Sequence, residues 1–448
     1  MYGDFSRLTF DRDNGYTAVW SQQGRVQLDA DANEQTAILL DWMRTLATDF
    51  IGPAGGHIER AGFKVSVNDT GDLVLSPGHY YVNGIRCEVP TVDSSGAPAV
   101  TTYSSLESAE LSDIPKNAPY LVYVKVWEST VNQLLAPALL EPALGPTSPD
   151  TTIRSKVNWA IDFIAKPPDV VPPDTLAGVV ADQFAQKNSP NVLLPGLRAR
   201  VTEAGSDADA DESGTIAGYS GLENQLYRVE IHRGSDDPKG PTFKWSRDNG
   251  SVEFGFTKLE VVDQKANGVK VELAGAPLPG RPRLAVGDCV EVIDKSWRPF
   301  GTPGTLFTVM GVSSPDADVQ TDDASTQAPS PAGVLRRWDS VPENGDGAPA
   351  TLAKDRTDDW IPIEKGIGIQ FTAVNDAVFT RGDHWVIPAR AATSAIYGPT
   401  AAAEGDGSPP FGPQRHLAPL AHVDGKDVID LRNLFTHLAW PDSPGGPP

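Results

Sequence analysis

The sequence predicts a mainly β, multi-domain protein of β-sandwich or β-barrel modules, with few short helices and an N-terminal strand–helix attachment unit. Short runs of Val, Ile, Thr and Tyr alternate with turn residues, and the chain contains 42 Gly and 39 Pro but only three Met. Its 448 residues exceed what one hydrophobic core supports. At roughly 100–200 residues per domain, we expect two to four domains.

The attachment unit is predicted within residues 19–52. Val26 and Leu28 alternate with polar residues, which indicates a short half-buried strand. A helix should follow at once. Asp31 or Asn33 could accept hydrogen bonds from its first free backbone N–H groups.

This helix is expected to end at Gly52-Pro53, and Glu34 is placed as its reciprocal cap. Apolar residues recur along one face at helical spacing, and such a narrow stripe cannot be buried by the unit alone. It must pack on the rest of the chain or on a partner. The predicted interface residues of this attachment helix are Leu39, Trp42, Met43, Leu46 and Phe50.

The remaining elements are read in chain order. Residues 1–18 resemble an extended arm with a turn at 13–15, and Asn83-Gly84 predicts a tight hairpin between HYYV and IRCEV. Tyr120–Thr130 alternates cleanly and should be a central strand, and Val157–Ile164 should be another.

Later segments continue the β pattern. Asp248-Asn249-Gly250 predicts a hairpin between FKWSR and SVEFGF. RLAVGDCVEVID and GTLFTVMGV resemble a small barrel meander, and VLRRW, IGIQFTAV and HWVIPA read as strands. Short helices are expected at Leu176–Gln186 and near Val428–Phe435.

Two low-complexity segments, 205–214 and 313–332, suggest domain boundaries. The expected units are 1–52 (arm, strand and helix), 53–204 (β domain), 215–312 (hairpin plus small barrel-like meander) and 333–448 (C-terminal β domain).

The formal charge of −22, from 37 basic and 59 acidic residues, argues against nucleic acid and anionic membrane surfaces as partners. No run of apolar residues is long enough for a membrane span, and the N-terminus lacks a signal-peptide pattern. We therefore expect cytoplasmic synthesis without membrane insertion. Cys87 and Cys289 should be reduced and buried.

Candidate metal sites are weak. Asp29, Asp31 and Asn33 match the start of a calcium loop, but Glu34 and Leu40 occupy the places of its Gly and bidentate Glu, so helix capping is favoured. The acidic run 207–212 could hold calcium loosely, but its composition favours a solvated loop. The seven His residues show no zinc spacing.

Catalytic signals are equally weak. Asp383 and His384 are neighbours on a predicted strand and should point to opposite faces. No nucleophile elbow, phosphate loop or dinucleotide motif is present. The sequence thus predicts no enzyme activity, no catalytic or metal-ligating residue and no cofactor.

The tryptophans are spread over every segment, and most are expected in cores, with a few as interface anchors or sugar-stacking platforms. They are Trp20, Trp42, Trp127, Trp159, Trp245, Trp297, Trp338, Trp360, Trp385 and Trp440.

Several blocks together resemble a bacterial family of unknown function whose members are encoded among phage-tail-like and contractile injection system genes. The blocks are GDFSRLTF (3–10), QQGRVQLDADANEQ (22–35), SPGHYYVNG (76–84), YLVYVKVWE (120–128), GYSGLENQLYRVEIH (218–232), FKWSRDNGS (243–251), GDHWVIPAR (382–390) and APLAHV (418–423). Ala32 departs from the bulky residue expected in the DAD-x-NE block, which puts contacts of that side chain in doubt.

The resemblance implies a structural component of the particle, such as a baseplate, tail-fibre or appendage scaffold. Its partners would be other baseplate or tail proteins. From the predicted attachment unit we further expect a homo-oligomer formed through the first 52 residues. The alternative is a carbohydrate-binding or carbohydrate-cleaving tail module, motivated by the tryptophans and the acidic loops. The two carboxylates that a glycosidase needs are unspecific evidence, because every acidic β protein contains them. A third hypothesis, a free-standing cytoplasmic enzyme, has no motif in its favour.

Overall fold

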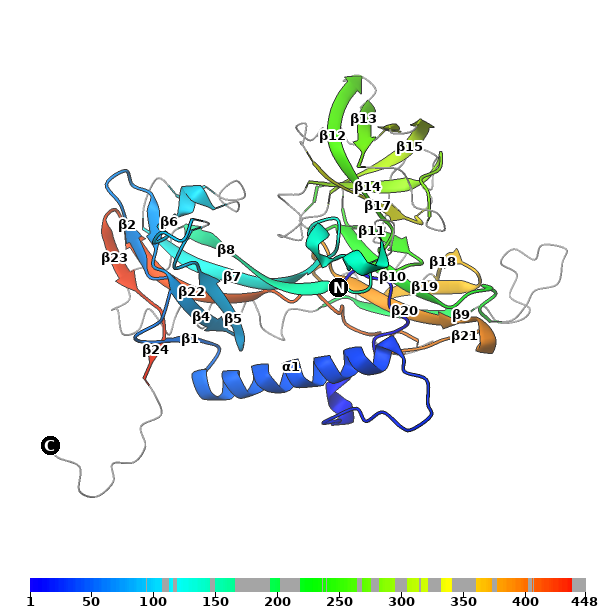
Figure 1. Cartoon of the computed structure of the whole chain (residues 1–448), viewed down its shortest axis with the longest axis horizontal. Helices are drawn as coiled ribbons and strands as arrows, with labels where there is room; N and C mark the ends of the chain where they lie inside the picture. The colour runs from blue at the N-terminus through cyan, green and yellow to red at the C-terminus, as the bar shows by residue number, and fades with distance from the viewer. Residues whose placement is uncertain are drawn as a thin grey trace.

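A computed structural model shows three β-rich bodies with one long helix beneath two of them (Figure 1). This confirms the predicted mainly β, multi-domain fold. The structure describes residues 1–93, 95–106, 113–115, 119–145, 150–165, 194–201, 218–235, 237–238, 240–263, 268–274, 282–294, 304–313, 316–320, 332–340, 360–372, 377–401, 405 and 407–436. The expected helix 176–186 and the acidic run 207–212 lie outside these residues.

The N-terminal region contains a short 3-10 helix, η1 (Arg12–Asn14), and the helix α1 (Asp29–Ile51). Gly15, at φ 66°, closes the predicted turn. The strand expected at Val26 and Leu28 is wrong, because both side chains are exposed and the helix begins directly after them. The predicted end is confirmed, since the Gly52 N–H donates to the Thr48 carbonyl.

The first body, here called the terminal lobe, combines strands from both ends of the chain. Its sheets have the orders β24-β1-β4-β5, β23-β22-β7-β8 and β2-β3-β6. The strands are β1 (Ala54–His57), β2 (Val65–Val67), β3 (Leu73–Leu75), β4 (Gly78–Val82), β5 (Ile85–Val89), β6 (Thr101–Thr102), β7 (Tyr120–Val131), β8 (Arg154–Ala165), β22 (His416–Asp424), β23 (Asp427–Asp430) and β24 (Leu434–Phe435). Its largest core is aliphatic and aromatic, and a smaller cluster contains Leu121, Tyr123 and Leu431.

Three sequence predictions are decided in this lobe. β7 lies inside its sheet, as expected for Tyr120–Thr130, and β8 contains Val157–Ile164. The hairpin at Asn83-Gly84 is confirmed, with positive φ at both residues and β4 paired to β5. The helix expected near Val428–Phe435 is wrong, because these residues pair as β23 and β24.

The second body, here called the middle lobe, packs a sheet of order β11-β10-β20-β21 with a sheet of order β18-β19-β9 around its own core. The strands are β9 (Gly196–Val201), β10 (Gln225–Arg233), β11 (Thr242–Ser246), β18 (Ile361–Glu364), β19 (Ile367–Thr372), β20 (His384–Arg390) and β21 (Ala395–Ile396).

The third body is a closed barrel with the strand order β12-β13-β16-β15-β14-β17. The strands are β12 (Glu253–Asp263), β13 (Gly268–Leu273), β14 (Cys289–Asp294), β15 (Thr305–Ser313), β16 (Asp316–Gln320) and β17 (Gly333–Trp338). The predicted barrel meander is thus confirmed, and Cys289, like Cys87, is free and buried.

The three bodies are nested in the sequence. The barrel is inserted between β11 and β18 of the middle lobe, and the middle lobe is inserted between β8 and β22 of the terminal lobe. Strand pairing therefore crosses the boundaries expected from the low-complexity segments. β9, from the expected unit 53–204, pairs with β19 of the expected unit 333–448, and β17 of that last unit closes the barrel.

Asp248-Asn249-Gly250 is a turn, as predicted, but it does not form a hairpin. Asn249 and Gly250 both have positive φ. β11 before the turn pairs with β10, however, and β12 after it pairs with β13 and β17. This turn therefore carries the chain from the middle lobe into the barrel.

Candidate functional site

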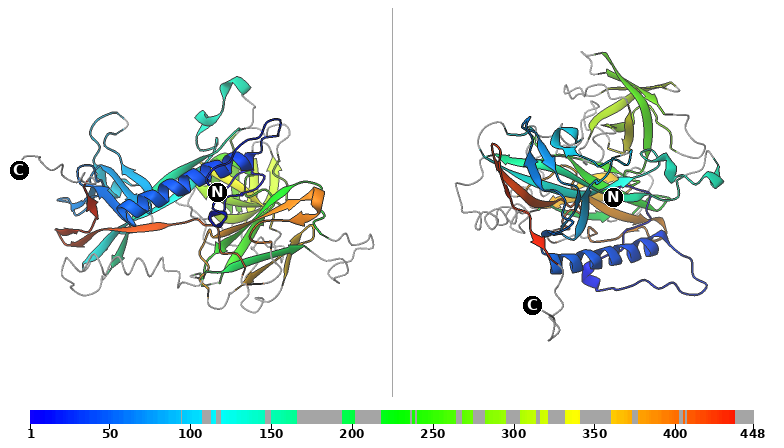
Figure 2. Two further views of the ribbon diagram at one scale, coloured as in Figure 1. Left: turned by 90° about the horizontal axis from the view of Figure 1, so that it is seen from below. Right: turned by 60° about the vertical axis from the view of Figure 1, so that its left-hand side comes forward.

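The helix α1 runs as a strut below the terminal and middle lobes (Figures 1 and 2). Its inward side carries both apolar and polar residues. Ala30 and Ile38 are its buried residues, and Arg44 Nη2 lies 2.8 Å from Glu128 Oε1 on β7. A surface helix usually turns its large apolar side chains to the core and its charges to water. In α1 only these two apolar residues are buried, and most of the large apolar side chains are exposed.

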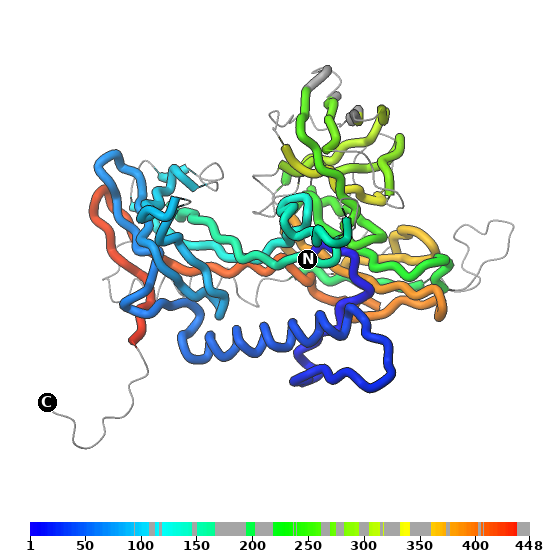
Figure 3. The backbone as a smooth tube through the Cα atoms, viewed as in Figure 1, coloured from blue at the N-terminus to red at the C-terminus, as the bar shows by residue number. Residues whose placement is uncertain are grey.

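The N-terminal arm, residues 1–28, runs from the centre of the molecule down to the start of α1 (Figure 3). Four polar contacts bind it to the helix. The Ser6 N–H donates to Asp29 at 2.9 Å, the Thr9 hydroxyl to Glu34 at 2.5 Å, and the Val19 N–H to Gln35 at 2.7 Å; Arg12 pairs with Asp41. These contacts fix which face of α1 points inward.

Those contacts also correct the expected roles of the first helical turn. The N-cap residue is Leu28, which has no capping side chain, and Asp31 and Asn33 lie within the helix. Asp29 holds the arm. The hydrogen bond from Ser6 is among the contacts that outweigh burial and lower the pKa of its carboxyl group.

The five predicted interface residues lie together on the outward face of α1, and we call them the outer stripe. Trp42 is 69% exposed, Phe50 66% and Met43 64%, and Leu39 and Leu46 are about half exposed. Large side chains at this spacing are ordinarily buried in a folded protein. Within the part of the chain that the structure describes, this stripe is therefore uncovered.

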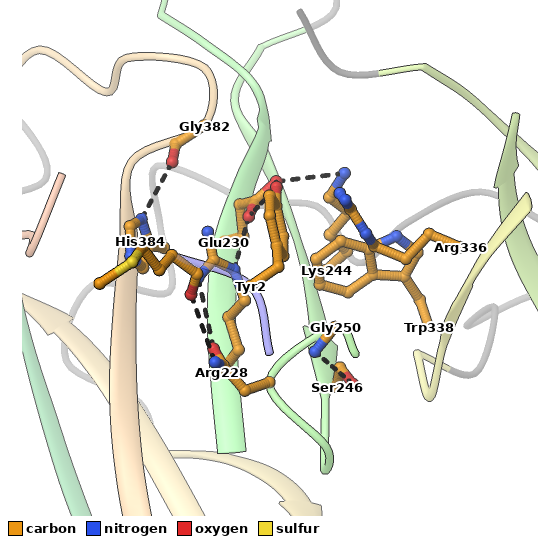
Figure 4. Close-up of polar contacts among 12 residues, drawn as sticks. Tyr2, Arg228, Glu230, Lys244, Ser246, Gly250, Arg336, Trp338, Gly382 and His384 are labelled. Carbon is orange, nitrogen blue, oxygen red and sulfur yellow. Dashed lines mark hydrogen bonds and ion pairs between the residues drawn. The ribbon is translucent and has the colours of Figure 1, made fainter. Parts of the chain in front are cut away.

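The other end of the arm is inserted at the junction between the middle lobe and the barrel (Figure 4). The Tyr2 hydroxyl contacts both carboxylate oxygens of Glu230, at 2.8 and 3.0 Å. The Tyr2 ring lies between two guanidinium groups, 4.0 Å from the Cζ of Arg228 and 3.4 Å from that of Arg336. Such cation–π contacts gain strength when they are shielded from water.

Tyr2 covers a buried charge cluster, which we define as Arg228, Glu230, Lys244, Glu253, Glu291 and Arg336. Strand pairing builds it. Glu230 of β10 lies opposite Lys244 of β11, and Arg336 of β17 lies between Glu253 of β12 and Glu291 of β14. Residues that lie opposite each other on paired strands point to the same face of the sheet. The middle lobe therefore presents one set of charges, Glu230 and Lys244, and the barrel presents a second set, Glu253, Glu291 and Arg336.

An ion pair joins the two sets across the junction. Lys244 Nζ lies 2.8 Å from Glu291 Oε1 and 3.3 Å from Glu230 Oε1. Arg228 Nε contacts Glu230 at 2.7 Å, and Arg336 Nη2 contacts Glu253 at 2.7 Å. The cluster holds equal numbers of cations and anions, which burial requires because an unpaired buried charge is costly.

The electrostatics of the two central carboxylates follow from this pairing. Burial alone would raise the pKa of Glu230 and Glu291, but Lys244 and the neighbouring arginines outweigh it and lower both pKa values. Both groups therefore stay ionised. Burial also raises the pKa of the Tyr2 hydroxyl, so Tyr2 remains a hydrogen-bond donor.

The turn at Asn249-Gly250 completes the junction. Asn249 Nδ2 donates to the Gly3 carbonyl at 2.9 Å, which holds the arm in place. A Cβ on Gly250 would lie 2.8 Å from the Tyr2 ring, so this position needs glycine for space as well as for its positive φ. Asn249 and Gly250, predicted to form a hairpin turn, instead form the binding surface for Tyr2 and the start of the arm.

The sequence analysis did not identify this cluster. One signal was present, since YRVEIHR and TFKWS carry charges at alternating positions of strands that are otherwise apolar. Charged residues that alternate with apolar ones along a strand usually indicate that one face of the strand is in contact with solvent. The structure shows that β11 is buried along its whole length and that Arg228 and Glu230 of β10 are buried with it.

A cavity of about 800 Å³ lies where the arm, α1 and the terminal and middle lobes meet. Leu8 and Phe10 of the arm, Arg44 of α1, Trp127 of β7 and His384 of β20 are among its lining residues. Apolar side chains and arginines share its walls. The arm covers one side, so the position of the arm determines access to it.

His384 is the first residue of β20 and Asp383 directly precedes the strand; both are buried. Burial raises the pKa of Asp383 to about 7, opposed in part by Arg415, and lowers the pKa of His384 well below its usual value. The His384 Nδ1 atom lies 3.4 Å from the Gly382 carbonyl (Figure 4).

The described ranges contain no group of three or more His, Cys, Asp or Glu side chains placed to hold a metal ion. In the same part of the chain, no helix has both the length and the apolar character needed to cross a bilayer.

Comparison with known proteins gives one match. A model described as a family of unknown function, DUF6519, matches residues 1–168 and 180–429. No curated protein and no solved structure matches the chain. The matched segments contain the arm, α1, the charge cluster and the outer stripe. Because they span most of its length, the chain belongs to the DUF6519 family.

Proposed function

We propose that this protein is a non-catalytic structural component of a phage-tail-like or contractile injection particle, at the baseplate, a tail fibre or an appendage. It is attached to other particle proteins through residues 1–52. The observation that carries the proposal is the exposure of the outer stripe on a helix that buries only Ala30 and Ile38 and is held to β7 by the ion pair of Arg44 with Glu128.

A contiguous exposed apolar patch of this kind is unusual in a protein that works alone. Monomeric proteins rarely expose patches beyond a few hundred Å², and larger ones mark contacts with other molecules. Within α1 the stripe contains Trp42 and Phe50, residue types that dominate the energetics of protein interfaces. The stripe is therefore suited to binding protein.

The arm offers a second contact. Between Gly15 and α1 it projects away from the body as a loop (Figure 3), and Trp20 and Val26 there are 86% and 84% exposed. An extended segment with unpaired backbone groups can add to the sheet of a neighbour, with its side chains supplying specificity. The loop and the outer stripe together form the proposed attachment region.

The particle type comes from the resemblance of the sequence blocks to proteins encoded with phage-tail-like genes. The fold is compatible with such a role. Nested insertion and the buried charge cluster tie the bodies together at several points, as a load-carrying scaffold requires.

The carbohydrate alternative rests on tryptophan, and the positions of the described tryptophans favour protein contacts. Trp127, Trp245, Trp338 and Trp385 are buried, and Trp159 and Trp360 are partly buried. The exposed ones, Trp20 and Trp42, lie in the arm and on α1. Within the described residues, then, the exposed tryptophans are those of the attachment region.

The test uses the particle itself. Particles would be purified from cells with and without the gene for this chain, and compared by electron microscopy and by mass spectrometry of their proteins. We expect the chain among the particle proteins, and a missing density or failed assembly without it. Intact particles of unchanged composition in both strains would refute the proposal.

Truncation is a poor substitute for this experiment. Deleting residues 1–52 would remove Tyr2 from the junction as well as the outer stripe. Loss of incorporation would then report either misfolding or lost attachment. Point substitutions in the projecting loop, such as Trp20→Ser with Val26→Ser, leave the buried anchor in place and test attachment alone.

A further inference from the structure

We propose that the outer stripe is a self-association surface, through which two copies of the chain pair helix against helix. The inference rests on the proposed function in one respect: it takes the stripe as a contact surface and names its occupant. The projecting loop with Trp20 and Val26 is then left for other proteins of the particle.

The spacing of the stripe is the first argument. Leu39, Met43, Leu46 and Phe50 follow one another at intervals of four, three and four residues. These intervals match the a/d spacing of a coiled coil over less than two heptads, which allows a short crossing in which apolar side chains of one helix insert between those of an identical helix. Trp42 and Leu40 flank this line and are exposed too.

The charge of the stripe is the second argument. The chain carries a formal charge of −22, so two copies repel each other over most of their surface. The exposed side of α1 around the stripe carries Thr36, Leu40 and Ala47, and Asp49 is the charged residue beside it. A nearly neutral patch suits an identical partner, whereas a basic partner would need acidic residues there.

The area of the stripe is the third argument. With Leu40, the exposed parts of its apolar side chains amount to roughly 800 Å², about what each partner contributes to a standard-size interface. A helix pair that buries this area on both sides reaches the size of stable complexes. A two-fold pair also closes on itself, because the same patch serves both partners.

The helix is already held in the orientation that pairing needs. At its start Asp29 accepts from the Ser6 N–H, and at its end the Ile51 carbonyl accepts from Asn433 Nδ2 at 3.3 Å. In its middle Arg44 pairs with Glu128. Pairing therefore requires no folding or rotation of the helix, which lowers its entropic cost.

The experiment measures the mass of the full chain in solution by sedimentation equilibrium, at concentrations up to about 50 µM, a range that covers micromolar dissociation constants. The expected species has twice the 47.8 kDa mass of the chain. Leu46→Glu should weaken the pair by about tenfold or more, since it places a charge at its centre.

The matched control is Thr45→Glu. Thr45 is exposed and adjacent in sequence, but it lies on a different side of the helix from the stripe. It adds the same charge, and we expect it to leave the dissociation constant unchanged within about twofold. Far-ultraviolet circular dichroism of both variants would verify that the fold is retained.

The outcomes separate this inference from the proposed function. A monomer at every concentration, or a dimer that resists Leu46→Glu, overturns the inference. If such a monomer is still incorporated into particles, the proposed function stands and another protein covers the stripe. A dimer that Leu46→Glu dissociates but that is absent from particles supports the inference and refutes the proposed function.

Discussion

The hydroxyl of Tyr2 contacts both carboxylate oxygens of Glu230, a residue 228 positions away in the chain. The start of the arm is thereby part of the junction between the middle lobe and the barrel. Loosening this contact should free the arm and expose the charge cluster, and the cavity beneath the arm should open with it.

Tyr2→Phe should release the arm partially, and Tyr2→Ala should release it fully. Phe keeps the ring between Arg228 and Arg336 and loses only the hydroxyl bonds, worth about 1–3 kcal/mol for a charged acceptor. Ala also loses the ring, at about 3–5 kcal/mol. Hydrogen exchange of residues 3–10 would measure both effects, with faster exchange expected in Ala than in Phe.

Tyr16→Ala is the control for arm release. Tyr16 lies in the same arm but is 62% exposed. Its removal should change the exchange of residues 3–10 little, since surface substitutions usually alter stability by less than about 0.5 kcal/mol. Equal protection in wild type and Tyr2→Ala would contradict the role assigned to Tyr2.

Lys244→Met should weaken the junction between the barrel and the middle lobe. Methionine fills a similar volume but leaves Glu230 and Glu291 without the cation that lies between them. Breaking a buried ion pair on one side costs about 3–5 kcal/mol. The thermal unfolding midpoint should fall by several degrees, and proteolysis should cut first near the turn at 248–250.

Lys258→Met on the barrel provides the comparison. Lys258 also pairs with a glutamate, Glu260, but both side chains are more than half exposed. Exposed pairs contribute about 0–1 kcal/mol. The midpoint should hardly move. A similar fall in the unfolding midpoint for both lysine substitutions would show that the buried cluster contributes no more to stability than an exposed ion pair does.

Gly84→Ala should detach α1 from the β4–β5 hairpin. A Cβ there would lie 2.3 Å from the Arg44 carbonyl oxygen, and Gly84 has a φ of +71°. Gly71→Ala is the matched control, because its φ is +84° with open space around it. Both substitutions should incur backbone strain of about 1–2 kcal/mol, because an L side chain disfavours the left-handed conformation.

Only Gly84→Ala adds the collision with the helix, at about 1–3 kcal/mol more. Hydrogen exchange of the amides near Arg44 should therefore accelerate in Gly84→Ala and not in Gly71→Ala. Unchanged protection of α1 in both variants would mean that the hairpin does not hold the helix.

Asp383 should make stability fall as pH rises. Its pKa in the folded protein is about 7, above the usual value of 3.8, so the folded state holds a proton that the unfolded state has released. Between about pH 4 and pH 7, stability is therefore lost as pH increases. Asp383→Asn should remove this loss and stabilise the protein near pH 8, but not near pH 3.5.

Thermal midpoints at these two pH values would measure that difference, with Asp427→Asn on the exposed start of β23 as the control. The control should change the midpoints little at either pH. If Asp383→Asn shifts both midpoints equally, the carboxyl group is not titrating as its burial indicates.

Several features could be predicted because they depend on neighbours in the sequence. Asn83-Gly84 forms its hairpin because both residues adopt positive φ at low cost and the flanking strands pair with each other. α1 ends at Gly52 for an equally local reason. The strand expected at Val26 does not form. Two alternating apolar residues do not make a strand unless another strand pairs with them, and Val26 and Leu28 are exposed.

Asn249-Gly250 shows where local reasoning stops. The turn forms as expected, yet β11 and β12 pair with other strands. A turn fixes the direction of the chain only over a few residues, and the partners of the two strands are decided by the cores that they help to fill. The binding surface for Tyr2 therefore could not be read from the sequence around it.

By itself the sequence determined the β-rich class, the single long N-terminal helix and the residues of the outer stripe, because alternation and helical spacing are local properties. Only the tertiary structure decided that the stripe faces outward, that Tyr2 covers a buried charge cluster, and that the bodies are nested. Those three features depend on contacts between residues far apart in the chain, such as Arg44 with Glu128 and Lys244 with Glu291.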